Sequence, residues 1–117
     1  MEGKISIDEF KKVEIKVGEI LSAEKVPDTD KLLRLVVDFG LAPGGDKREE
    51  RQVISGIAEF FPDLAQLVGK RCPFVTNLEY RTIRGLESQA MILATGGTPE
   101  EPFSLFETHA SPGATAR

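Results

Sequence analysis

The chain has few of the residues on which catalysis, disulfide bonding or membrane insertion depends. Among its 117 residues there is one cysteine, Cys72, and one histidine, His109. A single cysteine excludes an internal disulfide and a cysteine-based metal site within one chain. Neither residue lies in a recognisable nucleophile motif, which disfavours a Cys72–His109 catalytic pair. Apolar runs are short and the N-terminal MEGKISIDEFKK has no apolar core, so we expect no membrane span, no signal peptide and a cytoplasmic location.

An acid–base constellation is also missing. The acidic pairs DTD (28–30), EE (49–50) and EE (100–101) lie in turn-like segments, without a histidine partner or a glycine-rich phosphate loop. We interpret them as solvated surface charges. The sequence therefore predicts a non-catalytic protein with no cofactor and no metal.

Aromatic residues are scarce, with no tryptophan and one tyrosine, Tyr80. The formal net charge is −4, but the acids concentrate in GDKREE and TPEEP, whereas residues 77–86 carry two arginines and one glutamate. A local basic patch sets the field that a phosphate meets at short range, so the net charge does not exclude a nucleic-acid partner. Scarce aromatics favour recognition of the shape and backbone of a folded RNA over a stacking groove for single strands.

What is present is a succession of short elements. Ser6 and Glu9 form a capping box that predicts a short N-terminal helix over about 6–12. VEIKV (13–17) alternates as a half-buried strand does, and Gly18 predicts a bulge or sharp bend within a strand that continues to Ala23. After the turn PDTD, KLLRLVVDFG (31–40) predicts a second strand with Leu33, Leu35, Val37 and Phe39 on one face.

The remaining elements follow at similar spacing. The segment 41–51 is rich in glycine, proline and charge, which predicts a loop. A third strand is expected at 52–57, and FPDLAQLVGK predicts one short helix that begins near Pro62 and ends at Gly69. RCPFVTNL and SQAMILAT are expected to be strands four and five, and FSLF a brief strand in the tail.

Five short strands with a helix between the third and fourth are typical of the OB-fold, an all-β Greek-key barrel that binds oligonucleotides or oligosaccharides. An SH3-like barrel is the alternative. We expect a single domain over 1–117, with the helix at about 6–12, the barrel at about 13–95 and a C-terminal extension at about 96–117.

Several blocks in order carry a more specific signal: KVEIKVGEILSAEKVPDTDKLLRL, QVISGI, LVGKRCPFVTNL and RTIRGLESQAMILA. Together they resemble the tRNA-binding domain found at the C-terminus of many bacterial methionyl-tRNA synthetases, as a freestanding protein, and in a cofactor of eukaryotic synthetase complexes. The resemblance implies a homodimer, formed through the N-terminal segment and the C-terminal extension, that binds the outer face of tRNA. It leaves open whether the chain is freestanding or part of a methionyl-tRNA synthetase.

The resemblance also implies a set of tRNA-binding residues. Ala90 replaces a glycine of the family's S-Q-G-M block, the loop 44–51 is longer than usual, and the tail departs from the family pattern. The matched positions are Lys31, Arg34, Ser55, Asn77, Arg81, Arg84, Gly85, Ser88 and Gln89.

These positions differ in how strongly the residues themselves point to a ligand. Arg81 and Arg84 beside Gly85 suit paired hydrogen bonds to phosphates, although two arginines alone would more often be a solvated loop face. Asn77, Ser88 and Gln89 are equally compatible with structural capping and with contacts to bases or 2′-hydroxyls. Ser55 fits a small residue at a bend, and Met91 is expected in the core.

The sequence thus predicts a non-catalytic tRNA-binding module whose partners are tRNA, a second copy of the chain and a methionyl-tRNA synthetase. Two alternatives remain. One is a secretion-chaperone-like protein of the same fold that binds peptides in an apolar groove, which the basic positions disfavour. The other is a dimerisation tail of a synthetase.

Overall fold

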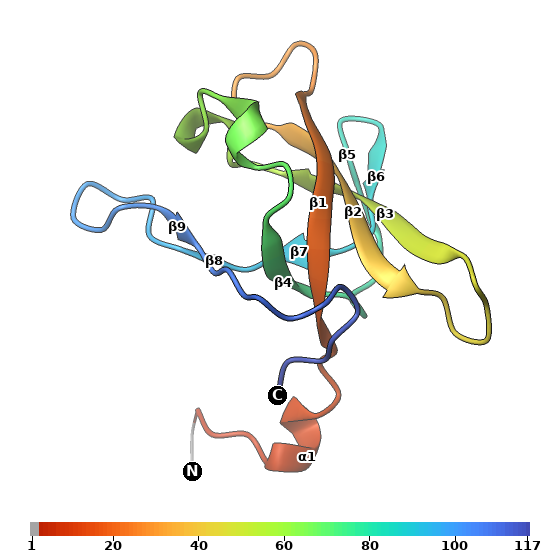
Figure 1. Cartoon of the computed structure of the whole chain (residues 1–117). Helices are drawn as coiled ribbons and strands as arrows, with labels where there is room; N and C mark the ends of the chain where they lie inside the picture. Colours follow the sequence, from red (N-terminus) through yellow and green to blue (C-terminus); the bar gives the residue numbers. More distant parts are fainter. Residues whose placement is uncertain (1–2) are drawn as a thin grey trace.

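A curled antiparallel sheet of five strands forms the body of the protein (Figure 1). The computed structural model describes residues 3–117. The sheet has the order β3-β2-β1-β4-β7 and curls into an OB-like half-barrel, and two short hairpins flank it. The strands are β1 (Ile15–Lys25), β2 (Leu33–Leu41), β3 (Arg48–Ser55), β4 (Arg71–Val75), β5 (Arg81–Ile83), β6 (Leu86–Ser88), β7 (Met91–Ile92), β8 (Ala94–Thr95) and β9 (Ser104–Leu105).

The predicted inner face of β2 is confirmed. Leu33, Leu35, Val37 and Phe39 are all buried, because the period of two puts alternate side chains on the concave side of the sheet. Phe39 meets Phe74 of β4 edge to face, with ring centroids 5.3 Å apart. Both strands therefore contribute to one core.

Gly18 does not form the predicted bulge. It pairs in register with Cys72 of β4, and the register shift of β1 lies between Ile20 and Ser22 instead. A Cβ atom at Gly18 would collide with the side chains of Val37 and Phe39. The glycine thus serves close packing of β1 over the core rather than a bend.

Two expectations for the middle of the chain are wrong. In place of one helix from Pro62 to Gly69, the chain forms two 3₁₀ turns, η1 (Ala58–Phe60) and η2 (Leu64–Gln66). Pro62 has no N–H to continue a helix from η1, and the residues after it are too few to sustain an α-helix. The predicted loop 41–51 also gives way to strand from Arg48 onward, since this segment pairs with the end of β2.

The predicted fifth strand, 88–95, is divided. Ser88 ends β6, and β7 and β8 follow as separate two-residue strands. Met91 is 46% exposed and not in the core, whereas its neighbour Ile92 is buried. The loop expected before Ser88 is itself a hairpin, formed by β5 and β6.

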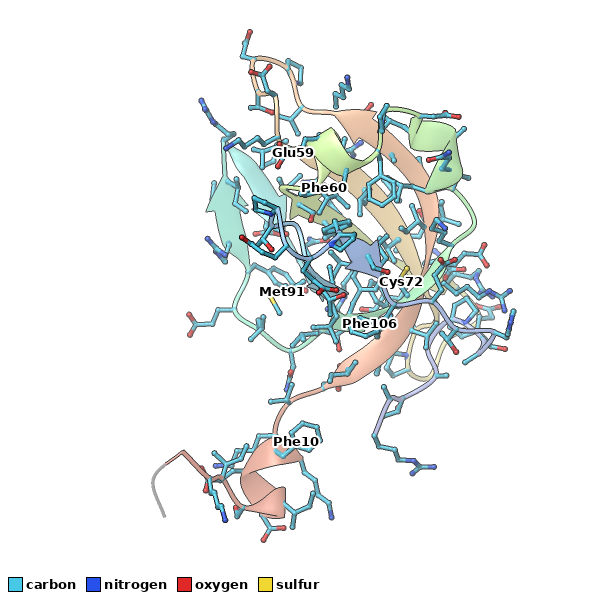
Figure 2. The ribbon with its side chains drawn as sticks, turned by 90° about the vertical axis from the view of Figure 1, so that its left-hand side faces the viewer. Phe10, Glu59, Phe60, Cys72, Met91 and Phe106 are labelled. Carbon is cyan, nitrogen blue, oxygen red and sulfur yellow. The ribbon has the colours of Figure 1, made fainter. Side chains whose placement is uncertain are left out.

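The N-terminal helix α1 (Ile7–Phe10) has the predicted capping box, in which Ser6 and Glu9 bond reciprocally. None of its residues is buried, and both figures show it lying away from the half-barrel, with Phe10 far from the interior position of Cys72 (Figure 2). The C-terminal tail instead returns to the sheet. Residues 113–116 bond to β1, including Val17 N–H to Ala114 O at 2.9 Å.

Among the described residues, no helix is long and apolar enough to cross a membrane.

Candidate nucleic-acid interface

The β5–β6 hairpin carries two of the predicted binding residues at fixed positions. Arg81 opens β5 opposite Ser88, and Ile83 pairs with Leu86 across a two-residue turn. The turn residues Arg84 and Gly85 have φ of 54° and 81°. Positive φ at both central residues is the pattern of a type I′ turn, whose twist matches that of the paired strands. The hairpin therefore places Arg84 at its tip and Arg81 at its base.

Neither hairpin arginine forms an ion pair with the residues that the structure describes. The ion pairs within residues 3–117 do not include Arg81, Arg84 or Lys31, and the side chains of these three are all exposed. The four arginines of the sheet each have an acidic partner, at 2.7–2.9 Å. These pairs are Arg34–Glu24, Arg48–Asp38, Arg51–Glu49 and Arg71–Glu19.

Two hollows lie beside the hairpin and gather the predicted residues. One, of about 420 Å³, lies between the tip and the β1–β2 loop and is lined by Lys31 and Arg84. The other, of about 100 Å³, lies between the hairpin and the half-barrel and is lined by Ser55, Arg81 and Ser88. The structure thus brings together Lys31 with Arg84, and Ser55 with Arg81.

Arg34 is held close to the same hairpin but is already engaged. Its Nε donates to Gln52 Oε1 at 2.6 Å and its Nη1 to Glu24 Oε1 at 2.7 Å. Gln52 in turn donates from Nε2 to the carbonyl of Glu87 on β6, at 2.9 Å. A phosphate that binds Arg34 therefore competes with Glu24.

Asn77 has a clear structural role. Its Oδ1 accepts from the backbone N–H of Glu14 at 2.7 Å, and its Nδ2 donates to the carbonyl of Lys12 at 2.6 Å. The side chain thereby ties the segment after α1 to the end of β4. Its partners are backbone groups more than sixty residues away, so the local sequence could not reveal them.

Ser88 and Gln89 join the two edges of the half-barrel. Ser88 Oγ accepts from the N–H of Ile54 at 3.0 Å, and Gln89 Oε1 accepts from the N–H of Gln52 at 3.0 Å. The N–H of Gln89 donates to the carbonyl of Gln52 at 2.8 Å. Both side chains therefore satisfy backbone donors of β3, and Ser88 is buried. We refer to this set of contacts as the seam.

Arg51 also belongs to the seam. The sequence did not predict this role. Its Nη1 donates to the carbonyls of Thr76 at 2.7 Å and Gln89 at 3.1 Å, and its guanidinium lies 5.5 Å from the ring centroid of Phe39. Its side chain is only 16% exposed. In the sequence it lies within a charged run, GDKREER, that gives no sign of burial.

Cys72 behaves as part of the core. Burial, with a smaller contribution from Glu107, raises the pKa of its thiol to about 11. The thiolate is the reactive form of cysteine, so this thiol is inert near neutral pH. Among residues 3–117 there is also no group of three His, Cys, Asp or Glu side chains placed to hold a metal ion.

Comparison with known proteins assigns a family to this arrangement. Residues 15–115 match the family model described as "Putative tRNA binding domain". The chain is 43% identical over 106 residues to the methionine–tRNA ligase of Enterococcus faecalis, covering 91% of this chain and 15% of the ligase. It is 49% identical over 92 residues to the ligase of Methanosphaerula palustris, covering 79% and 13%. It thus spans a small part of these relatives.

Solved structures agree with the fold. A MetRS-related protein from Pyrococcus horikoshii superposes with a TM-score of 0.85 and 36% identity, and the match covers 100% of both chains. The chaperone CsaA from Bacillus anthracis gives a TM-score of 0.77 at 18% identity, over 98% of this chain and 100% of CsaA. At that identity the second likeness concerns the fold alone.

Proposed function

The chain belongs to the family of tRNA-binding domains just described, and from this premise we propose that it is a non-catalytic module that binds tRNA through the β5–β6 hairpin and the start of β2. The observation that carries the proposal is the pair of arginines on the β5–β6 hairpin, Arg81 at its base and Arg84 in its turn, neither of which forms an ion pair within residues 3–117. A planar guanidinium with no protein acceptor is available to a phosphate without the cost of breaking an ion pair.

We assign the predicted residues unequal roles in this proposal. Lys31, Arg81 and Arg84 bind phosphates, and Arg34 joins them when a phosphate displaces Glu24. Gly85 allows the turn, and Ser55 lines the smaller hollow together with Arg81. Asn77, Ser88 and Gln89 act by holding the hairpin in place rather than by touching RNA, because their polar groups already have protein partners.

The module would act in the cytoplasm by assisting a methionyl-tRNA synthetase, either as part of the same chain or as a separate protein. A second, weak tRNA site raises the effective tRNA concentration at the catalytic part without altering the active site. Four phosphate contacts per protomer correspond to a slope of roughly −3 for log affinity against log salt.

Salt-dependent binding of bulk tRNA tests the proposal. Arg81→Ala/Arg84→Ala should lower the affinity by about tenfold or more at low salt and reduce the magnitude of the salt slope by about 1.5. Lys47→Ala/Arg117→Ala, which removes the same charge from two exposed basic residues distant from the hairpin, should bind nearly as wild type. Equal affinities of the two double variants would refute the site.

We further propose that two copies associate through the N-terminal segment. Ile7 and Phe10 are 65% and 42% exposed, and exposed apolar clusters of this kind mark interaction surfaces. Sedimentation equilibrium of Ile7→Ser/Phe10→Ser should give a monomer with unchanged far-UV circular dichroism. A variant that still sediments as a dimer would move the contact elsewhere, and a dimer that binds no tRNA would favour the role of a dimerisation tail.

Peptide binding is the alternative that one observation supports. The smaller hollow is lined by the apolar side chains of Leu78, Ile83 and Met91 as well as by Arg81. A peptide-binding protein should bind an unfolded protein substrate with an affinity that is insensitive to Arg84→Ala and lowered by Met91→Ser. The tRNA-binding module should show the reverse dependence with tRNA.

A further inference from the structure

The hollow at the hairpin tip combines charges that a simple phosphate site would avoid. It is lined by Asp28, Thr29, Asp30, Lys31, Leu32 and Arg84. We propose that it binds one ribose–phosphate unit of RNA. Lys31 and Arg84 take the phosphate, and the carboxylates of Asp28 and Asp30 accept a hydrogen bond from the ribose 2′-hydroxyl. The inference rests on the proposed function and adds how the module distinguishes RNA from DNA.

The size and position of the hollow suit such a unit. Its volume of about 420 Å³ lies within the range typical of small-ligand sites, roughly 300–1,000 Å³. It opens between the β1–β2 loop and the hairpin tip, two segments that are distant in sequence. A sugar–phosphate chain that enters this hollow is therefore contacted from two sides, by the loop and by the hairpin tip.

All four charged side chains of the hollow are available. Within residues 3–117, Asp28, Asp30, Lys31 and Arg84 make no ion pair and no side-chain hydrogen bond. The loop that presents the carboxylates is nevertheless fixed. Thr29 Oγ1 donates to the carbonyl of Val26 at 3.2 Å and accepts from the N–H of Leu32 at 3.3 Å.

Backbone conformation marks the same place. Asp28 and Arg84, with φ of 64° and 54°, are the non-glycine residues with positive φ in the described part of the chain, and both line this hollow. Aspartate tolerates positive φ. Arginine adopts it at a higher energetic cost than glycine or asparagine would. An arginine in this conformation is consistent with a use for its side chain.

The chemistry of the two aspartates distinguishes ribose from phosphate alone. A carboxylate repels a phosphate, so two of them weaken a site that recognises only the backbone charge. A carboxylate is also a strong acceptor for a hydroxyl donor, and the 2′-hydroxyl is the donor that RNA has and DNA lacks. Cations and carboxylates side by side therefore match a ribose with its adjoining phosphate.

The test compares a tRNA with a DNA strand of the same sequence, because both carry the same backbone charge. Asp28→Asn/Asp30→Asn removes both charges and keeps neutral acceptors, and Asn tolerates positive φ. Asp28→Gly/Asp30→Ala removes charge and acceptor alike without placing a side chain at positive φ. Asp46→Asn/Glu50→Gln is the charge-matched control. Asp46 lies in the β2–β3 loop and Glu50 in β3 opposite Asp38, about 25 Å along the sheet from the hollow. Thermal melting confirms that each variant is folded.

For wild type we expect tighter binding of the tRNA than of the DNA strand. The preference should fall about tenfold in Asp28→Gly/Asp30→Ala and by less in Asp28→Asn/Asp30→Asn, while DNA binding tightens in both. Equal tightening of RNA and DNA in both variants would overturn the inference, because the aspartates would then only repel phosphate. No binding of tRNA by wild type would instead refute the proposed function.

Discussion

On the five-stranded sheet every arginine has an acidic neighbour, whereas on the β5–β6 hairpin neither arginine has one among the described residues. The most buried of the first group, Arg51, bonds to two carbonyls and stabilises the seam. The second group consists of Arg81, at the base of the hairpin, and Arg84, in its turn, and both side chains are exposed. The same residue type thus serves the fold in one region and remains available for a partner in the other, and the difference lies in what surrounds the guanidinium.

Removing the structural arginine should have the largest effect. Arg51→Met should lower the free energy of unfolding by about 2–4 kcal/mol, because it leaves the carbonyls of Thr76 and Gln89 without their charged donor. Urea denaturation measures the loss. tRNA affinity of the folded variant should stay within about twofold of wild type.

The matched control for that variant is Glu49→Gln. Glu49 pairs with Arg51 at 2.9 Å but is partly exposed, so the substitution should cost less than about 1 kcal/mol. If Arg51→Met were as stable as Glu49→Gln, the seam would not depend on Arg51. The conclusion that Arg51 serves the fold would then be wrong.

At the hairpin tip, a substitution should increase stability and weaken tRNA binding. Arg84→Asn should raise the free energy of unfolding by about 0.5–1 kcal/mol, because asparagine adopts positive φ more readily than arginine, and should weaken tRNA binding. Arg84→Lys keeps the charge and the unfavourable backbone conformation, so it should match wild-type stability and retain most of the affinity. Urea titrations and tRNA binding at low salt give both quantities. An Arg84→Asn variant that binds as tightly as wild type would remove Arg84 from the interface.

The smallest effect should come from freeing a paired arginine. Glu24 is 63% exposed and holds Arg34 at 2.7 Å, so Glu24→Gln should change stability by less than about 0.5 kcal/mol. Affinity for tRNA should rise about twofold to threefold, since Arg34 gains a phosphate and a like charge disappears. Glu19→Gln, whose partner Arg71 contacts the tail at Ala110, should leave affinity unchanged. An equal rise in both variants would indicate a net-charge effect.

Local periodicity was sufficient for part of this architecture. The face of β2 followed from the alternation of Leu33, Leu35, Val37 and Phe39, and the capping box of α1 from Ser6 and Glu9. Both features depend on neighbours within a few residues. The helix expected after Pro62 is absent, and two 3₁₀ turns take its place. The prediction rested on signals for the two ends of a helix, but the segment between them is too short to sustain an α-helix.

The tRNA-binding residues stay a prediction, whereas the structure shows how these side chains are placed and bonded. The positions of Arg81, Arg84 and Lys31 came from a family resemblance, and the structure brings Lys31 and Arg84 to one hollow. The hairpin itself was missed, because arginine is an unusual first residue for a type I′ turn. The partners of Asn77, Ser88 and Gln89 are backbone groups tens of residues away, which no short-range pattern records.

The seam has a consequence for how this fold can change. The segment 78–87 is anchored by Asn77 before it and by Ser88 and Gln89 after it, and these anchors bond to backbone groups of other segments. These bonds hold the two ends of the segment to the half-barrel independently of the side chains at the hairpin tip. We therefore expect that the hairpin can be replaced while the half-barrel keeps its structure. We expect that a hairpin of different sequence, grafted between the same anchors, would change the ligand while leaving the sheet as it is.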